Sequence, residues 1–590
     1  MCGFLGKIAN TDFDLKELDE PNISIICRGP DNTQKLKFMQ GNLFCGLIFN
    51  RLSILDLSEN ANQPMISGTT GSVIVFNGQI YNHIELRKNL VSKGIIFKTS
   101  HSDTEVVLQG LDFEGISFVS KLRGQFSIFY FDKKNNKQFL IRDRVGQKPL
   151  YYAISDSKLI FGSNLSSVKK LLKTSSIDIH QINNYLKYGI IGGRKTLYKE
   201  IFKVLPAEIV EVELSNKVSI KRIIYWDITT KVDNLIFDEI EFFNIFSEAV
   251  ELRLAADVPI ANFLSGGLDS TSIVKNMYEK NKNINTFTVG TESKKYDETK
   301  WAKEVSDKYH TNHRSVLVPT NLNFEYIDKI INSMDEPYAD PSIIPSYMIA
   351  NEISKYYKVA ISGDGGDELL GGYERTKISL NKPSLIGNYF SKIYNFYPPF
   401  LGTGSFFLSK RNDLSVRYKS FLEDEKLLEL LNVNRTDSDN YVNIVKEIDD
   451  YKALLIADYK FYLPDMMLYK IDRMSMANSL EVRSPFVDHK LIEYIISHNS
   501  IYKKSNENKS IIKKYLLQDF NQNFVNRKKQ GFMIDLESWI FNNLDYFYDY
   551  IFSSKKLKDF DLNSLSLLKL NKSRINAQRI WKLYVLEKFI

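Results

Sequence analysis

The sequence has few cysteines and no run of apolar residues long enough to cross a membrane. Its 590 residues include three cysteines, Cys2, Cys27 and Cys45. An odd and sparse set argues against a disulfide framework and favours a reducing compartment. The N-terminal residues, MCGFLG, have no basic region ahead of a hydrophobic one, so they do not predict a signal peptide. We therefore expect a cytoplasmic protein that makes no contact with a membrane.

The charge balance gives little support to a nucleic-acid partner. The net charge is +7, and the lysines are dispersed apart from short clusters at residues 503–504 and 527–529. Dispersed lysines are typical of a solvated surface, and a mildly basic protein also suits small anionic substrates. At 590 residues the chain is too long for one hydrophobic core, so two or three domains are expected.

Residues 263–270 (FLSGGLDS) form the stretch around which the second part of the chain is organised. An apolar run at 258–264 predicts a buried strand, and the spacing of residues 271–277 predicts a helix. A Ser/Gly turn between them places free backbone N–H groups and a helix dipole at one spot, which suits a phosphate. No Lys follows the second Gly, so this is not a Walker loop. Asp269 would repel a phosphate unless a cation such as Mg²⁺ lies between them. The alternative is an ordinary strand-to-helix turn.

A second stretch gathers acidic side chains. The apolar run at 359–361 ends in a Gly-rich turn that holds Asp364, Asp367 and Glu368. Carboxylates so close together repel one another, so a cation or a basic substrate group is expected among them. A Gly-rich loop with solvated acids is the alternative.

Strands and helices alternate around these two stretches. A helix is predicted at 239–254, a strand at 286–290, and a helix opened by residues 296–298 that runs through Ala302 and Val305. Such alternation favours an open, doubly wound parallel sheet with its ligand at the carboxyl ends of the strands.

Cys2 follows the initiator methionine. Removal of Met1 would leave a residue with both a thiol and a free α-amine, and that amine can serve as the base for its own thiol. Taken alone, Cys2 could equally be a small residue that happens to follow Met1. The runs at 72–76 and 126–131 predict strands, and 83–90 and 104–111 predict helices, which suits two sheets between helices. Cys27 and Cys45 lie in apolar runs that predict inert core thiols.

Six short motifs behind Cys2 stand in the order of the class II glutamine amidotransferases, the N-terminal-nucleophile type. They are residues 28–31 (RGPD), 50–54 (NRLSI), 76–82 (FNGQIYN), 102–105 (SDTE), 122–126 (LRGQF) and 142–152 (RDRVGQKPLYY). A hairpin is predicted through 212–226, and the polar residues 227–233 predict a short, ordered linker.

The residue types fit glutamine chemistry. Arg51 can bind the carboxylate of glutamine as a bidentate pair, and Asp103 can bind its ammonium group. Asn77 and the Gly78 N–H can form an oxyanion hole for the thiol adduct. The alternatives are a surface ion pair for Arg51, a helix cap for Asp103 and a hairpin turn for Asn77 and Gly78.

The second part resembles the glutamine-hydrolysing, B-type asparagine synthetase family. SGGLDS is similar to the pyrophosphate loop of ATP pyrophosphatases, and residues 362–373 (SGDGGDELLGGY), 335–342 and 470–489 match further family motifs. The resemblance implies that Asp269 and Asp367 hold Mg²⁺, that Asp364 lies close to the acceptor, and that Lys509 stabilises an adenylate. It implies an ATP site made of Leu264, Ser265, Gly266, Gly267, Asp269, Ser270, Val289, Ser362 and Gly363.

The resemblance covers nearly the whole chain and implies an αββα sandwich at 1–230, followed at 231–590 by a doubly wound parallel-sheet ATP-pyrophosphatase domain with helical additions. Residues 383–450 are expected to be a variable helical insertion. The implied reaction amidates aspartate with glutamine and Mg-ATP, with ammonia crossing an apolar, water-poor domain interface.

Three residues depart from the family pattern. Asn50 replaces a usual His, Gln79 replaces a usual Glu in the expected glutamine site, and Asp364 replaces a frequent Glu. The loss of charge at Gln79 predicts weaker glutamine binding. The shorter Asp364 leaves open another carboxylate acceptor, such as a sugar uronic acid in surface-polysaccharide synthesis. A protein that only binds nucleotide or glutamine is the non-enzymatic alternative. The residues leave the oligomeric state open, with a homodimer as one option.

Overall fold

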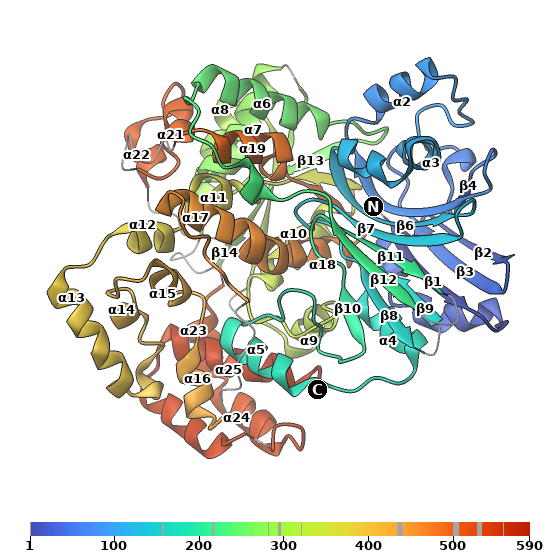
Figure 1. The fold of residues 1–590 in the computed structure, drawn as a ribbon. Helices are drawn as coiled ribbons and strands as arrows, with labels where there is room; N and C mark the ends of the chain where they lie inside the picture. The colour runs from blue at the N-terminus through green and yellow to red at the C-terminus, as the bar shows by residue number, and fades with distance from the viewer. Residues whose placement is uncertain are drawn as a thin grey trace.

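The protein is described here by a computed structural model (Figure 1). It describes residues 2–155, 158–214, 218–280, 282–292, 297–319, 321–433, 441–499, 507–527, 534–558 and 560–590. Several positions used above lie outside these ranges: Met1, Tyr296, the lysine pair at 503–504 and residues 528–532.

The N-terminal part consists of two six-stranded antiparallel sheets that face each other, on the right of Figure 1. The first sheet has the order β10 (Ile201–Lys203), β8 (Tyr151–Ser155), β9 (Lys158–Gly162), β1 (Gly3–Ala9), β3 (Leu43–Arg51) and β2 (Asn32–Gln40). The second has the order β12 (Ser219–Ile224), β11 (Glu208–Glu213), β7 (Lys137–Arg142), β6 (Gly124–Asp132), β5 (Val73–Ile80) and β4 (Met65–Ile66). Phe4, Leu47, Val75, Phe129 and Phe161 pack between the sheets.

Helices cover both outer faces of this pair of sheets. Leu86 of α2 (His83–Ser92) and Val107 of α3 (Asp103–Glu114) pack on Ile74 and Ile128 of the second sheet. Leu165 and Val168 of α4 (Leu165–Leu172) pack with Leu5 and Ile48 of the first sheet. Because each sheet is apolar on both faces, the arrangement is the αββα sandwich that the sequence predicts.

A five-stranded parallel sheet forms the centre of the second part. Its order is β15 (Asn312–Val318), β14 (Asn285–Thr291), β13 (Ile260–Phe263), β16 (Val359–Ile361) and β17 (Glu481–Arg483). Val274 of α7 (Leu268–Glu279) and Phe246 of α6 (Glu239–Leu252) belong to the core on one face. Ile349 and Ala350 of α10 (Ile343–Ile353) cover the other face. The sheet is therefore doubly wound, and the order reverses between β13 and β16, where ligands bind in such sheets.

Helical additions surround the parallel sheet. The insertion contains α13 (Leu385–Phe390), α14 (Ser405–Leu408), α15 (Leu414–Lys419) and α16 (Glu425–Leu430), as the sequence predicts for its described residues. The C-terminal helices α23 (Leu536–Asn542), α24 (Leu544–Ser553) and α25 (Arg574–Glu587) pack on one another and lie in the lower part of Figure 1, close to α16. Within the described ranges, no helix is both long and apolar enough to span a membrane.

Two sequence-based interpretations differ from the structure. Cys27 is exposed, whereas Cys45 is buried as expected, so the prediction of a core thiol is wrong for Cys27. Its apolar neighbour Ile26 is exposed too, because these residues form a short helical turn whose buried side is taken by Ile25 and Arg28. Residues 481–483 form β17, although the sequence around them reads as a polar helix followed by a turn.

Candidate active sites

Cys2 lies directly before β1, and hydrogen bonds fix its backbone from two directions. Its N–H donates to Asn77 Oδ1 at 3.0 Å, and its carbonyl accepts from Arg28 Nε at 3.2 Å. The residue is buried, and burial raises the pKa of its thiol, although the nearby charge of Arg51 lowers it. A thiol in such a place reacts only with a base close by, which the α-amine of Cys2 itself can provide once Met1 is removed.

Asn77 and Gly78 lie within strand β5 and not in a hairpin turn. Gly78 pairs with Phe126 of β6 and has a φ of +155°. A Cβ at this position would lie 2.0 Å from the carbonyl oxygen of Gln125. Only glycine fits against this carbonyl, so the Asn77–Gly78 pair is held rigidly beside the backbone of Cys2.

Arg51 and Asp103 supply the two charges that an amino-acid ligand requires. The Arg51 guanidinium donates to the carbonyls of Asp56 and Ser58 and to Asn62 Oδ1. Among the described residues, no carboxylate forms an ion pair with it, so its charge stays available for a ligand carboxylate. Asp103 accepts the N–H of Ile80 at 2.9 Å and does not cap its helix. Burial raises the pKa of Asp103, and an ammonium group beside it would counter this effect.

The two departures in this region have different surroundings. Asn50 is fully buried and exchanges hydrogen bonds with Asn22, while its Oδ1 also accepts from Thr33. It therefore has a packing role in the first sheet. Gln79 is buried on β5, and its Oε1 accepts from Arg483 at 3.3 Å. The neutral side chain of Gln79 thus faces a guanidinium that comes from the other part of the chain.

A separate cavity of about 640 Å³ lies at the carboxyl ends of β13, β14 and β16. Of the residues predicted to bind ATP, it is lined by Leu264, Ser265, Gly267, Asp269, Ser270, Val289, Ser362 and Gly363. Asp364, Asp367 and Lys509 line it too. This size is ordinary for a small-molecule pocket, for which roughly 300–1,000 Å³ is typical.

The Ser/Gly loop joins β13 to α7 and is closed by its own side chains. The Gly267 N–H donates to Ser265 Oγ at 3.2 Å, and the Ser265 N–H donates to Ser270 Oγ at 3.3 Å. Gly267 caps the 12-residue helix α7, so the positive end of the helix dipole points into the cavity. Gly266 is the exception among the predicted residues. With a φ of +70°, it packs against the backbone of Trp301 and does not line the cavity.

Lys509 lies between the two aspartates that the sequence predicts as metal ligands. Its Nζ is 2.5 Å from Asp269 Oδ2 and 2.5 Å from Asp367 Oδ1. A Cβ on Gly372 would lie 2.1 Å from Asp367 Oδ1 and 2.3 Å from Lys509 Cε, and a Cβ on Gly366 would lie 2.6 Å from Asp269 Cγ. The glycines of the second stretch therefore allow these three charged side chains to meet.

The same arrangement suits a cation that is shared with a phosphate. In the described part of the chain, no cluster of three or more His, Cys, Asp or Glu side chains could enclose a metal ion. Mg²⁺ is commonly bound by one or two carboxylates together with substrate phosphates and waters, so Asp269 and Asp367 fit that ion when a nucleotide is present.

The cavity is also lined by groups to which the sequence analysis gave no individual role. Glu368 is fully buried and accepts a hydrogen bond from the Tyr373 hydroxyl at 2.6 Å. Burial, and then the charge of Asp367, raise the pKa of Glu368 to about 7. Lys470 donates to Ser342 Oγ at 2.9 Å. These residues lie within the quoted motifs, and three carboxylates in a single turn were the available signal for Glu368.

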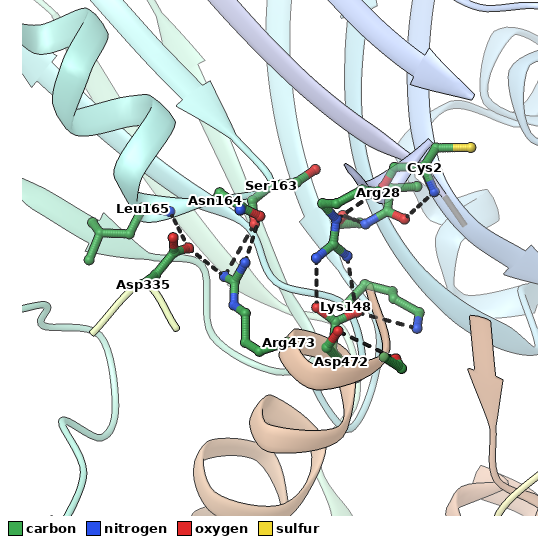
Figure 2. A network of polar contacts seen from close by, with 12 residues as sticks. Cys2, Arg28, Lys148, Ser163, Asn164, Leu165, Asp335, Asp472 and Arg473 are labelled. Atoms are coloured by element: carbon green, nitrogen blue, oxygen red, sulfur yellow. Dashed lines mark hydrogen bonds and ion pairs between the residues drawn. The ribbon is translucent and has the colours of Figure 1, made fainter. Parts of the chain in front are cut away.

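The two candidate sites are separated by a layer of buried ion pairs, part of which Figure 2 shows. Arg28 binds both oxygens of Asp472, and the Lys148 Nζ is 3.7 Å from the same carboxylate. Arg473 pairs with Asp335 at 2.8 Å. The interface that the sequence predicts to be apolar is therefore mixed. Charged groups meet here because each has an opposite charge within reach. Beside them, Leu52 and Ile54 of the first part pack with Val359 and Met476 of the second.

Strand β17 brings two charged side chains of the second part to the first site. Arg483 Nε donates to Glu481 Oε1 at 2.6 Å, and Gln125 Nε2 of β6 donates to the same oxygen at 3.4 Å. Together with the contact between Arg483 and Gln79, these bonds join the edge of the parallel sheet directly to the cysteine site.

Comparisons with known proteins found matches for both the first and the second part of the chain. The family model described as asparagine synthase matches residues 241–588, and the model of a glutamine amidotransferase domain matches residues 1–226. The "Asparagine synthetase [glutamine-hydrolyzing] 1" of Bacillus subtilis is 30% identical over 99% of this chain and 96% of its own length. The "Putative asparagine synthetase [glutamine-hydrolyzing] 2" of Methanocaldococcus jannaschii is 34% identical over 63% of this chain and 76% of its own length.

Another relative has a different name: the "Amidase chyE" of Penicillium rubens is 27% identical over 90% of this chain and 86% of its own length. The chain therefore belongs to the asparagine synthase family, as a glutamine-hydrolysing amidotransferase that amidates its acceptor with the use of ATP.

Proposed function

We propose that this enzyme makes asparagine from aspartate, with glutamine as the nitrogen donor and ATP converted to AMP and pyrophosphate. The main support for this proposal is that Lys509 forms ion pairs with both Asp269 and Asp367 beside the Ser/Gly loop. An ammonium, two carboxylates and a helix N-terminus are the groups needed to hold a triphosphate and to bind the pyrophosphate that leaves.

In the first half-reaction, Cys2 is the proposed nucleophile. Its α-amine takes the thiol proton, and the sulfur attacks the side-chain amide carbon of glutamine. Asn77 and the Gly78 N–H stabilise the oxyanion of the adduct. Ammonia leaves as the adduct collapses to a thioester, which water cleaves to glutamate. Arg51 and Asp103 hold the carboxylate and the ammonium of the substrate, so that its amide reaches the sulfur.

In the second half-reaction, a carboxylate oxygen of the acceptor attacks the α-phosphorus of ATP and pyrophosphate leaves. Ser265, Gly267 and Ser270 bind the departing phosphates, and Ser362 and Gly363 lie against the adenylate. Mg²⁺, held by Asp269 and Asp367, would supply positive charge to the phosphates. Ammonia then attacks the acyl carbon and AMP leaves, while Lys509 offsets negative charge on the reacting phosphate.

A small cavity supports the passage of ammonia between the two sites. It is lined by Gln125, Gln147 and Lys148 from the first part and by Ser362 and Asp364 from the second. Its volume is about 10 Å³, which is close to the space that one water-sized molecule needs. Residues 1–230 are assigned to the glutaminase domain and residues 231–590 to the synthetase domain, so this cavity lies where they meet.

Another carboxylate acceptor, such as a sugar uronic acid, is a second candidate. Asp364 lines the cavity near the proposed acceptor and is one methylene shorter than the Glu that is frequent there. Arg574 and Gln578 of α25 line the same cavity and could contact a larger acceptor.

One incubation distinguishes these acceptors. The enzyme receives Mg-ATP, amide-labelled ¹⁵N-glutamine and L-aspartate, and the products are read by mass spectrometry. Labelled asparagine with AMP and pyrophosphate supports the proposal. Release of glutamate without asparagine would agree with glutamine hydrolysis at Cys2 and would exclude aspartate as the acceptor. In a parallel reaction, Asp367→Asn should abolish the formation of AMP and leave glutamine hydrolysis unchanged. Loss of both activities would contradict separate sites.

A further inference from the structure

The helical insertion contains a long segment without acidic residues. Residues 375–412 include no Asp or Glu, six lysines or arginines and eight aromatic residues. Among the basic residues, Arg375 is tied to Asp458 in the interior. The proposed reactions use no residue of this segment, so its composition calls for another explanation.

Many of the apolar side chains in this segment point into solvent. Leu385 is 86% exposed, Ile386 72%, Phe396 86% and Phe406 68%. Tyr389, Phe390, Ile393 and Leu401 are exposed as well. Soluble domains rarely gather so many large apolar side chains at one place, and such patches mark contact with a partner or a lipid surface.

Four of these side chains share one face of helix α13. On α13, the exposed residues Leu385, Ile386, Tyr389 and Phe390 recur at the spacing of one helix face. On another side of α13, Asn388 Oδ1 accepts the N–H of Asn412 at 3.2 Å, which joins α13 to the segment that follows α14. Figure 1 shows α13 and α14 at the rim of the molecule, on the side opposite the antiparallel sheets.

Lysines lie directly beside the exposed rings. Lys392 Nζ is 5.0 Å from the centre of the Tyr389 ring, and Lys410 Nζ is 5.3 Å from that of Phe406. Among the described residues, no carboxylate forms an ion pair with Lys382, Lys392 or Lys410. A groove of about 680 Å³ between α13 and α14 is lined by Lys382, Lys410 and Phe406.

We propose that this surface, formed by α13, residues 391–396 and α14, docks on an anionic phospholipid bilayer. Apolar and aromatic side chains with flanking lysines match the boundary between headgroups and acyl chains, where rings insert and ammonium groups meet phosphates. The absence of acidic residues over residues 375–412 removes the repulsion that a negative surface would impose. The attachment is peripheral and replaces the sequence-based expectation of no contact with a membrane. It does not depend on which carboxylate the enzyme amidates.

The test is co-sedimentation of the full-length protein with vesicles. Vesicles of phosphatidylcholine with phosphatidylglycerol should bind the protein, binding should weaken as salt rises, and vesicles of phosphatidylcholine alone should bind little. Lys382→Gln and Lys392→Gln should each reduce the partition coefficient by about fivefold. A Leu385→Asp, Phe396→Asp double variant should abolish binding.

Matched controls distinguish binding through this surface from nonspecific hydrophobic binding to vesicles. Ile96 and Ile236 are 86% and 84% exposed but lie elsewhere, so Ile96→Asp and Ile236→Asp should bind vesicles as the unchanged protein does. All variants should keep glutamine hydrolysis and the same melting temperature. Equal binding to both kinds of vesicle, or binding to neither, overturns the proposal. Sedimentation velocity that shows a dimer broken by the double variant also overturns it, because the surface would then bind a second copy.

Discussion

The Arg28 guanidinium grips both carboxylate oxygens of Asp472, at 2.9 and 3.0 Å, while its Nε donates to the carbonyl of Cys2. One side chain therefore links the candidate nucleophile to helix α18 (Tyr469–Met476) of the other part of the chain. Both partners are buried, and the charges of Arg28 and Lys148 outweigh burial and hold the pKa of Asp472 below its usual range. The position of Cys2 thus depends on contact with the synthetase half.

Replacement of Arg28 tests this dependence. Arg28→Lys keeps the positive charge but cannot form the bidentate contact with Asp472, so the backbone of Cys2 should be held less firmly. We expect glutamine hydrolysis to fall by about tenfold to a hundredfold, because small misplacements of a nucleophile are costly. Synthesis from added ammonia should change much less. The exposed Arg222→Lys is the control. Normal hydrolysis by a folded Arg28→Lys protein would show that the link is structural only.

A substitution at Gly372 tests whether Asp367 and Lys509 must lie close together in the ATP cavity. Gly372→Ala places a Cβ 2.1 Å from Asp367 Oδ1 and 2.3 Å from Lys509 Cε, so these groups must separate. The conversion of ATP to AMP should fall by about a hundredfold, while glutamine hydrolysis stays unchanged. Gly387→Ala is the matched control, since its Cβ would meet Ser384 Oγ at an ordinary 3.4 Å. An active Gly372→Ala enzyme would mean that the contact between Lys509 and Asp367 is dispensable.

Glu368 gives the protein a dependence on pH. Its pKa is raised from 4.5 to about 7, first by burial and then by the charge of Asp367. The folded state therefore holds this proton more tightly than the unfolded state, so stability is lost as the pH rises from 4.5 through 7. Glu368→Gln removes this loss. The melting temperature of the variant, measured against that of the unchanged protein, should rise steadily across this range.

The neighbouring Glu374→Gln is the control, because Glu374 is exposed. A difference in melting temperature that stays constant with pH would show that Glu368 does not titrate in this way. A difference that falls with rising pH would reverse the sign of the argument.

Gln79→Glu tests the effect of a missing charge in the glutamine site. Gln79 stands where the family usually has Glu, and Arg483 lies 3.3 Å from its Oε1. A carboxylate here would add an acceptor for the substrate ammonium, and hydrogen bonds to charged groups are stronger than neutral ones. The KM for glutamine should fall by about fivefold, with kcat little changed. The exposed Gln34→Glu is the control. An increase in KM would indicate that Arg483 takes the new carboxylate away from the substrate.

Sequence patterns predicted the elements that carry regular spacing and apolar residues. The strand, Ser/Gly loop and helix around Asp269 agree with β13 and α7, and the αββα sandwich agrees with the β-branched and aromatic runs at β5 and β6. Strand β17 was missed because it has three residues and two of them, Glu481 and Arg483, are charged and fully buried. Their burial is stabilised by each other and by Gln79 and Gln125, which lie 404 residues from Arg483 and 356 residues from Glu481 in the chain.

The buried ion pairs between the two parts of the chain could not be predicted from the sequence for a similar reason. Arg28, Lys148 and Asp472 each look like solvated surface charges in the sequence, since buried pairs leave no local pattern. Folding brings them together and forms a polar boundary between the two sites. The roles of Cys2, Asp367 and Lys509 stay predictions that chemistry must test.

The most direct test of the two-site account is Cys2→Ala, assayed with glutamine and with ammonium chloride as alternative nitrogen sources in the presence of Mg-ATP and aspartate. The account predicts that glutamine no longer supports product formation, while ammonium supports it at close to the original rate, because the ATP cavity does not involve Cys2. Loss of both activities, or of neither, would contradict the account.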